Sequence, residues 1–430
     1  MFEGRGGGAA RNVALSRRAM VRAGLLAAAL PVGARASDRI RLGLIGCGAM
    51  GVSHIETVLQ RGAAENVAIT AVSDVYQRRL TRAQGMCGGR AFVDYRGLLD
   101  MDEIDAVVIA TPDHWHARMA IEALDAGKHV LVEKPLANSI PQALAVRKAA
   151  RESKRVFQVG SQALSNDAYW KANAAIREGR IGKVTWGHVS YNRNYRECLY
   201  NSQYRVDATA GPDRGGEDEI DWDLWLGSKW GLAPAISYNP EHFFRFRKYA
   251  PYNGGVASDL LYHKLAAFLT AVSGPNGEYP KRVSAQGGLY VEKDGRDTPD
   301  TFLMTVDFPS EWSLFLVSTL TNDSGLPERI YGKFGTMELD QGLKVHYNGE
   351  MGPEFQQKNG GRSEAEIPLE ARRDMLGNFL DAIRGTAQPF GNVELACSTM
   401  VSIQLAVEAF RRQTSLAWDA RQERISAAAA

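Results

Sequence analysis

The chain has 430 residues, which is enough for two or three domains at about 150 residues each. Hydrophobic residues make up 45% and charged residues 23%, a composition that is typical of globular proteins and excludes a mainly disordered chain. Lys and Arg number 51 against 49 Asp and Glu, so the chain lacks the surplus of positive charge that nucleic-acid binding requires, and we expect no nucleic-acid partner.

Residues 1–36 resemble an export signal. Arg17 and Arg18 precede an apolar run over residues 23–32, and a small-x-small triplet follows at residues 34–36. This order predicts a twin-arginine signal, an exported or periplasmic protein, and the twin-arginine machinery as a partner. A disordered basic tail is the alternative. The apolar run is too short to span a bilayer, so we predict no membrane span in the mature chain. Because this route exports folded proteins, a cofactor would be bound before export.

Residues 37–160 alternate short apolar runs with stretches of helical periodicity. Runs of this length, bounded by turns, are typical of buried parallel strands. They predict a doubly wound α/β domain of the Rossmann type, with strands at residues 40–45, 67–72, 106–110, 129–132 and 156–159.

A glycine loop follows the first of these strands and opens a helix. Gly46, Gly48 and Gly51 form the pattern G-x-G-x-x-G, with Ala49 and Met50 between the last two. The first glycine permits a tight turn, the second lets a pyrophosphate approach the backbone, and the third allows close packing of helix on strand. We predict that these five residues bind a dinucleotide.

Asp74 ends the second strand and indicates which dinucleotide binds. A carboxylate here accepts hydrogen bonds from the adenosine ribose and repels a 2'-phosphate, which favours NAD. Arg78 and Arg79 lie within one helical turn of it, and an arginine at this place accommodates NADP. We therefore predict NAD, with Arg78 as a further cofactor residue and NADP as the alternative.

Residues 161–415 have a different character. One helix at residues 169–178 and a strand at 184–191 precede a long aromatic, Gly-rich stretch over 192–253. Such long connections usually carry function. Strands without intervening helices then predict a largely antiparallel sheet and an α+β domain, and residues 416–430 are expected to form a tail. The later elements are expected at residues 301–308, 312–320, 372–383 and 393–412.

The four cysteines indicate neither disulfides nor zinc. Cys47, Cys87, Cys198 and Cys397 lie far apart, without a CxxC pair or a nearby histidine at ligand spacing. We expect most of them to be buried thiols, and we expect no metal site.

Three segments, together with the glycine loop, resemble the Gfo/Idh/MocA family of sugar and inositol oxidoreductases. They are residues 111–116 (Thr-Pro-Asp-His-Trp-His), residues 133–135 (Glu-Lys-Pro) and residues 254–263. The resemblance covers about residues 40–415. It implies a Rossmann domain followed by an open-faced sheet that often mediates oligomerisation, so a dimer or tetramer is expected. It also implies further residues at the cofactor: Thr111, Pro112, His114, His116, Glu133 and Lys134.

The resemblance carries catalytic roles to Lys134, Asp259 and His263. Asp259 and His263 are four residues apart, so on one helix they would share a face. Oxidation of a hydroxyl requires a base for its proton, and histidine titrates near working pH, which makes His263 the candidate base. Lys134 would stabilise alkoxide charge, and Asp259 would orient the substrate or tune its neighbour. Many members carry an acidic residue three positions after the histidine, where this chain has Ala266, so their substrates do not transfer.

Aromatic and polar side chains around residues 188–245 predict a carbohydrate cleft, because aromatic faces stack on sugar rings. Trp222 and Trp225 are equally well explained as core residues. The candidate substrate contacts are His188, Tyr191, Trp222, Trp225, His242 and Arg245.

Three functions remain open at this point. The leading one is an exported NAD-dependent oxidoreductase that acts on a sugar and keeps its cofactor tightly bound. Some exported relatives instead hydrolyse glycosides by transient C3 oxidation, elimination, water addition and return of the hydride. A non-catalytic sugar-binding protein is the third, and intact Lys134, Asp259 and His263 disfavour it.

Overall fold

The computed structural model describes residues 39–427. The predicted export signal lies outside the described residues.

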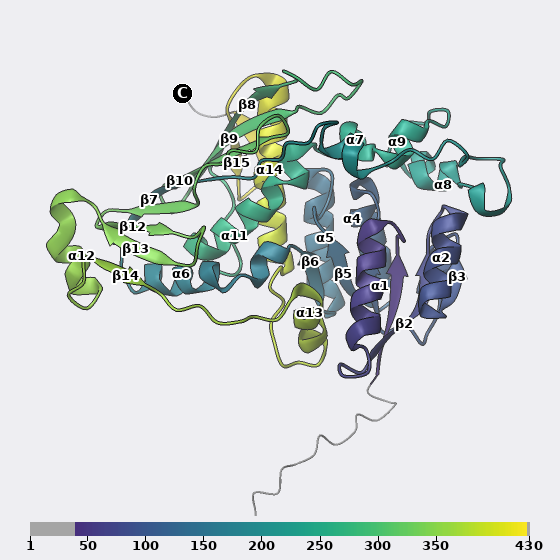
Figure 1. The fold of residues 1–430 in the computed structure, drawn as a ribbon, viewed down its shortest axis with the longest axis horizontal. Coiled ribbons are helices and arrows are strands. Elements are labelled where there is room, and N and C mark those ends of the chain that lie inside the picture. Colours follow the sequence, from purple (N-terminus) through teal and green to yellow (C-terminus); the bar gives the residue numbers. More distant parts are fainter. Residues whose placement is uncertain (1–38, 428–430) are drawn as a thin grey trace, which may run out of the picture. The chain divides into compact units, whose positions relative to one another are not determined.

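The first sheet has six parallel strands in the order β3-β2-β1-β4-β5-β6 (Figure 1). The order reverses between β1 and β4, and dinucleotides bind outside the carboxyl ends of the strands at such a point. The predicted doubly wound domain is confirmed, although the three-residue strand β3 was not foreseen. The strands are β1 (Ile40–Ile45), β2 (Val67–Ser73), β3 (Arg90–Phe92), β4 (Ala106–Ile109), β5 (His129–Glu133) and β6 (Phe157–Gly160).

Helices connect these strands, and a further helix from late in the chain packs against the same sheet. The connecting helices are α1 (Ala49–Arg61), α2 (Gln77–Cys87), α3 (Arg96–Leu99), α4 (Asp113–Asp125) and α5 (Ile140–Ser153). Helix α13 (Met375–Ile383) buries Phe379 and Leu380 in the same core as Ile55 of α1 and Leu42 of β1. Residues beyond the expected domain boundary at residue 160 therefore contribute to the core of the first domain.

The second sheet has ten strands in the order β14-β13-β12-β11-β7-β10-β9-β8-β15-β16. Within the described part of this second sheet, only β7 and β10 pair in parallel, which confirms the expected, largely antiparallel sheet. The central strands are β7 (Val184–Ser190), β8 (Arg282–Gly288), β9 (Thr301–Phe308), β10 (Trp312–Thr319) and β11 (Arg329–Gly332). The outer strands are β12 (Gly335–Glu338), β13 (Lys344–Tyr347), β14 (Glu364–Glu366), β15 (Leu416–Asp419) and β16 (Arg424–Ala427).

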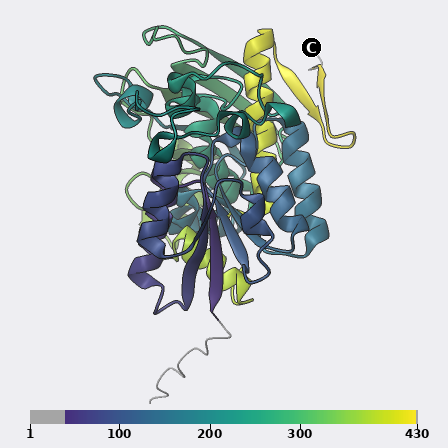
Figure 2. The same cartoon turned by 90° about the vertical axis from the view of Figure 1, so that its right-hand side faces the viewer.

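The helices α6 (Asp167–Arg177), α11 (Leu261–Ser273) and α14 (Val393–Arg412) pack together beside this sheet. Alternate residues of β9, from Phe302 to Phe308, are buried. Helix α14 is long and apolar enough to cross a membrane, but most of it is buried against α5, α11 and β8, as expected of a core helix. The predicted tail is wrong for residues 416–427, because β15 and β16 form a hairpin that extends the sheet next to α14 (Figure 2).

Residues 192–253, called the aromatic insert below, consist of short helices and turns. They include α7 (Leu199–Gln203), α8 (Trp222–Leu226) and α9 (Pro240–Phe244), and α10 (Val256–Asp259) follows directly. The insert has its own small core, in which Trp222, Trp225 and Phe243 pack with Tyr76 of the first domain. This shared core fastens the insert to the Rossmann domain.

Candidate active site and cofactor pocket

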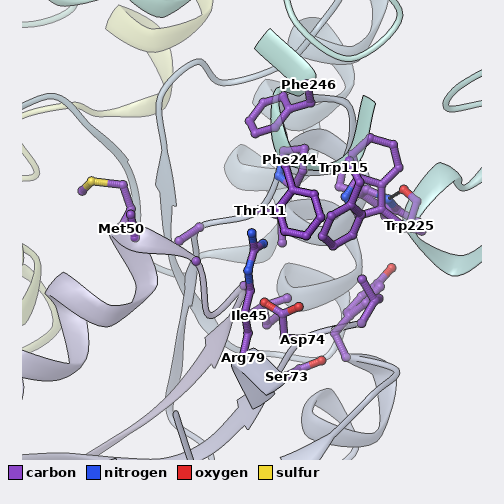
Figure 3. A pocket seen from close by; sticks show the side chains of 18 of the residues that line it. Ile45, Met50, Ser73, Asp74, Arg79, Thr111, Trp115, Trp225, Phe244 and Phe246 are labelled. Carbon is purple, nitrogen blue, oxygen red and sulfur yellow. Dashed lines mark hydrogen bonds between the residues drawn. The ribbon is translucent and has the colours of Figure 1, made fainter. Parts of the chain in front are cut away.

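A cavity of about 360 Å³ lies between the carboxyl ends of β1, β2 and β4 and the aromatic insert. The first domain contributes the glycine loop, Asp74 and the residues Thr111 and Pro112, and the insert contributes the second wall, which includes Trp225 and Phe244 (Figure 3). Of the predicted cofactor residues, Gly46, Gly48, Ala49, Met50, Asp74, Thr111 and Pro112 line this cavity.

The glycine loop fits a dinucleotide. A Cβ atom on Gly46, whose φ is +94°, would lie 2.6 Å from the carbonyl oxygen of Ala110, and one on Gly51 would lie 2.0 Å from that of Gly46. At Gly48 the nearest atom to such a Cβ is Arg79 Nη1, 3.9 Å away, so the second glycine opens onto the cavity. This is the space that a pyrophosphate needs at a helix N-terminus.

The charges around the cavity also suit a dinucleotide. Among the described residues that line it, four are arginines and one, Asp74, is acidic; the arginines are Arg79, Arg82, Arg205 and Arg247. The guanidinium of Arg79 lies 5.3 to 5.5 Å from the ring centres of Tyr76, Phe243 and Phe244. The structure thus places Arg79 at the cavity, whereas the predicted Arg78 pairs outside it with Asp207 and Asp218.

Asp74 also holds the glycine loop in place. Its Oδ2 accepts from the backbone N–H of Cys47 at 2.7 Å, and its Oδ1 accepts from that of Tyr76 at 2.9 Å. A carboxylate has further lone pairs, so Asp74 can still accept from a ribose hydroxyl.

His114 and His116 are buried and do not line the cavity. The Nε2–H of His114 donates to the carbonyl of Trp225 at 3.0 Å, and burial lowers the pKa of His114 to about 4. The ring nitrogens of His116 lie 2.7 and 2.9 Å from the carbonyl oxygens of Pro135 and Thr111. Burial also lowers the pKa of His116. These histidines join the loops after β4 and β5 to each other and to the insert.

Of the catalytic candidates, Lys134 follows the neighbouring strand β5, and Asp259 is the last residue of α10. Lys134 Nζ lies 2.5 Å from Asp259 Oδ1, and the same oxygen accepts from Arg247 Nε at 3.1 Å. Tyr200 donates to Asp259 Oδ2 at 3.2 Å. Burial alone would raise the pKa of Asp259, but the charges of Lys134 and Arg247 lower it below its usual value. Asp259 therefore stays ionised, and Arg247 connects it to the cofactor cavity.

His263 stands in the same region but does not share a continuous helix with Asp259. Helix α10 ends at Asp259, Leu260 interrupts, and α11 begins at Leu261. The Nδ1 atom of His263 lies 3.0 Å from Ser161 Oγ, and the ring of Tyr191 packs edge-on at 5.9 Å. Burial and the charge of Lys134 lower the pKa of His263 to about 3. The expectation that this histidine titrates near working pH is therefore wrong, and its imidazole is neutral near pH 7.

Two further carboxyl groups, those of Glu133 and Asp113, lie close to the catalytic candidates. Glu133 accepts from His54 Nε2 at 2.9 Å, which ties the loop after β5 to α1. Asp113 accepts from Asn253 Nδ2 at 2.5 Å, and burial raises the pKa of Asp113 to about 7. Asp113 belongs to the segment 111–116 that carried the family resemblance, yet its proximity to the charges of Lys134 and Asp259 becomes visible only in the fold.

The candidate substrate contacts divide into two groups. Tyr191 reaches His263, and Trp225 lines the cavity. The other four lie elsewhere: Trp222 stacks on Trp225 in the insert core, His242 stacks on Tyr249, Arg245 pairs with Glu241, and His188 packs with Trp186 and Tyr331 on β7 and β11. The core interpretation of Trp222 is therefore correct.

The Gfo/Idh/MocA family model, described as an oxidoreductase family with an NAD-binding Rossmann fold, matches residues 40–161. Inositol 2-dehydrogenase 2 from Saccharopolyspora erythraea is 36% identical over 190 residues, which cover 44% of this chain and 53% of that protein. A glycosyl hydrolase family 109 protein from Shewanella sp. strain W3-18-1 is 32% identical over 170 residues, which cover 37% of this chain and 36% of that protein. The chain thus matches about half and about a third of these relatives' lengths.

A solved structure extends the similarity to the whole fold. The WlbA dehydrogenase from Bordetella pertussis, in complex with NADH and UDP-GlcNAcA, has a TM-score of 0.63 and 18% identity; the match covers 89% of this chain and 99% of that one. Over residues 40–161 the expected family resemblance and the NAD-binding Rossmann fold are confirmed, and the solved structure confirms the expected fold over the rest of the chain.

Replacement of Asp74 and of Arg79 should shift cofactor preference in opposite directions. Asp74→Ala removes a ribose acceptor and a negative charge, so we expect the ratio of NAD to NADP on the purified protein to fall several-fold. Arg79→Met removes the cation nearest the second glycine and should raise that ratio. Mass spectrometry of nucleotide released by denaturation gives the ratio. Equal losses of both nucleotides in Asp74→Ala would show that Asp74 acts only through the glycine loop.

The buried neutral histidines should make the fold sensitive to acid. The pKa of His114 is about 4 in the folded chain against an ordinary 6.5, so below about pH 6.5 the unfolded chain binds a proton that the folded chain does not. Stability should therefore fall as pH decreases from about 6.5 to about 4. His114→Gln keeps a donor for the Trp225 carbonyl without titrating, and it should narrow the Tm difference between pH 7 and pH 4.5 by a few degrees in calorimetry. An unchanged difference would contradict this assignment.

Proposed function

We propose that this chain, which carries the NAD-binding domain of the Gfo/Idh/MocA oxidoreductase family, is an exported enzyme that oxidises a sugar or sugar derivative with a retained NAD. One observation carries the proposal: a neutral His263 and an ionised Lys134–Asp259 pair lie at the carboxyl edge of the same sheet as the glycine loop. When bound, NAD supplies the hydride acceptor.

The protein's own residues handle the proton. His263 is neutral near pH 7, so it can accept the hydroxyl proton as the adjacent C–H bond loses hydride. The low pKa of His263 also makes its imidazolium a ready donor when the proton is returned. Lys134 carries a positive charge close to His263, and that charge stabilises an alkoxide at the reacting oxygen.

Asp259 holds the Lys134 ammonium in position. Its carboxylate holds Lys134 through Oδ1, and the Lys134 ammonium also donates to its backbone carbonyl at 3.0 Å. These two contacts fix the ammonium in one place. A positioned cation stabilises charge without a reorganisation cost at the moment of reaction.

The aromatic insert supports retention of the cofactor because it is fastened directly beyond Asp74. The backbone N–H of Asp221 donates to Val75 O at 3.0 Å, and that of Gln77 donates to Glu219 O at 3.0 Å. Tyr76 donates to Asp207 at 2.9 Å, and Arg78 Nη1 pairs with the same carboxylate at 2.5 Å. A second pair joins Arg78 to Asp218. These contacts form a latch that holds the second wall of the cavity over the glycine loop.

A second candidate function is glycoside hydrolysis through transient oxidation. The latch favours it, because a retained cofactor suits a cycle in which the hydride returns to the same molecule, and one relative is a glycosyl hydrolase family 109 protein. Net reduction of NAD by a sugar would indicate the dehydrogenase. Glycoside cleavage without added NAD would indicate the hydrolase.

The open face of the second sheet supports a homo-oligomer. Trp186 is 42% exposed there and stacks on Tyr331 with ring centres 4.2 Å apart. Exposed aromatic rings of this kind are enriched at protein interfaces, so we expect a dimer or a tetramer.

Loss of the base should stop hydride transfer without loss of the fold. His263→Ala should slow a single turnover of bound NAD by about 100- to 10,000-fold, because the hydroxyl proton then has no positioned acceptor. Lys134→Met should slow it as well and should also lower the Tm, because Asp259 then keeps only Arg247 as a charged partner. Stopped-flow absorbance of NADH formation with a reactive sugar measures the rate, with the surface variant Lys171→Met as control. A near-native rate in His263→Ala would exclude it as the base.

Loss of the latch should speed release of NAD. Arg78→Ala removes two partly exposed ion pairs of up to about 1 kcal/mol each, so we expect dissociation to rise by about three- to tenfold. Release into a large excess of a competing nucleotide analogue gives the rate. Arg90→Ala, which removes an exposed arginine of β3 outside the cavity, should leave it unchanged. Equal rates in Arg78→Ala and the wild type would contradict the latch.

A further inference from the structure

Arg247 is an arginine of the aromatic insert that lines the cofactor cavity and also reaches the catalytic candidates. Its Nε donates to Asp259 Oδ1 at 3.1 Å, and the Lys134 ammonium binds the same oxygen, so the two cations lie side by side. The guanidinium carbon lies 5.0 Å from the ring centre of Tyr204 and 4.5 Å from that of Phe246, and both rings line the cavity. These contacts hold the guanidinium in one place.

The two Nη groups of Arg247 have no hydrogen-bond partner among the described residues, because its described side-chain bond is the one from Nε. The Nη atoms are not among the buried polar atoms that lack a partner, so each keeps some exposed surface. Burial raises the pKa of Asp113 and the charge of Arg247 lowers it, but the described contacts include no ion pair between these two residues. A guanidinium whose Nε is occupied still presents the edge between its two Nη groups, which matches the oxygens of a carboxylate or phosphate.

The arginines of the cavity divide between its two walls. Arg79 and Arg82 stand at the glycine loop: Arg79 Nη1 is the atom nearest to a Cβ on Gly48, and Arg82 donates to a loop carbonyl at 3.2 Å. They are placed for the pyrophosphate of the dinucleotide. Arg205 and Arg247 belong to the insert instead, and Arg205 makes no hydrogen bond or ion pair with a described residue. These two arginines are left for a different anion.

A second cavity, of about 520 Å³, shares Arg205 with the first. Its described lining contains one carboxylate, that of Glu197, and three arginines, which are Arg196, Arg205 and Arg245. Arg196 also makes no hydrogen bond or ion pair with a described residue. Positive charge therefore continues from Arg247 along the insert, and a cavity lined by one sign of charge concentrates ligands of the opposite sign.

We propose that the substrate oxidised at this site is an anionic sugar derivative, whose carboxylate or phosphate group is held by Arg247 with help from Arg205. The proposal rests on the proposed function, because it names the class of sugar that His263 deprotonates there. Because Arg247 and Lys134 share one oxygen of Asp259, an acidic group on the free edge keeps the rest of the sugar close to Lys134. Neither Arg205 nor Arg247 was among the sequence predictions.

Binding to the purified holoenzyme tests the charge of the substrate. The probes are D-glucose, D-galactose and D-mannose, each with its uronic acid, its uronamide and its terminal phosphate ester, measured by titration calorimetry at low ionic strength. The uronamide keeps the size of the acid and removes its charge. In at least one set we expect the acid or the phosphate to bind about tenfold more tightly than the neutral sugar and the amide. The tighter of the two identifies the anionic group. Failure of every acid and phosphate to exceed its neutral partners would overturn the proposal.

Variants show whether Arg247 is responsible for the preference. Arg247→Lys keeps a positive charge beside Asp259 but loses the edge of two N–H groups, so the preference for the anionic probe should fall about tenfold with little change for the neutral sugar. Arg205→Met should weaken the preference less, because Arg205 is exposed. Arg362→Met removes an exposed arginine that lines neither cavity and should leave the preference unchanged. An unchanged preference in Arg247→Lys would overturn the proposal, and a simultaneous loss of bound NAD would assign Arg247 to the cofactor. The wild-type titrations decide even if Arg247→Lys does not fold.

The bound nucleotide separates this proposal from the proposed function, and NADH absorbance at the end of each titration gives the readout. An anionic probe that binds tightly without reducing the bound NAD would leave the anion site standing and count against the oxidation. A neutral sugar that reduces the bound NAD as fast as its acid and its phosphate would support the oxidation and overturn the anionic substrate.

Discussion

The buried charge of Asp259 is the constraint on which the rest of the site depends. A buried carboxylate is stable only with charged partners, and Asp259 obtains them from two distant segments: Lys134 after β5 and Arg247 in the aromatic insert. Its ion pairs therefore join the Rossmann domain, the insert and the helix pair α10–α11 at one point. Burial lowers the pKa of His263, and the ammonium that Asp259 holds lowers it further, so the candidate base is neutral near pH 7.

The sheet edge explains how this point meets the cofactor. In the order β2-β1-β4-β5-β6, the cavity lies over the ends of β2, β1 and β4, and Lys134 and Ser161 follow the next two strands. A dinucleotide that crosses the reversal between β1 and β4 extends toward the strand that carries Lys134. The insert closes the other side with aromatic rings and Arg247. The cofactor cavity and the candidate catalytic residues thus lie next to each other along the carboxyl edge of the sheet.

The sequence predicts features that depend on a few neighbouring residues. It does not predict which face of a helix turns toward the cavity, or how a segment without regular secondary structure folds. The glycine loop is set by backbone geometry over six residues, so its place could be read directly. Arg79 rather than Arg78 faces the cavity because a rotation of one residue on α2 decides the direction, and no local pattern shows it. Arg247 lies in an insert without periodicity. The final hairpin was missed because its strands gain stability from pairing with β8, which is distant in sequence.

We propose that a hydride passes from a sugar carbon to a nucleotide that the protein already holds. The purified protein, without added NAD, is incubated with sugars and glycosides that carry deuterium at single ring carbons. The nucleotide is then released by denaturation and weighed by mass spectrometry. We predict that deuterium from one ring carbon appears in the nicotinamide, for the dehydrogenase and the hydrolase alike. Substrate conversion with deuterium absent from the nucleotide at every labelled position would contradict the account.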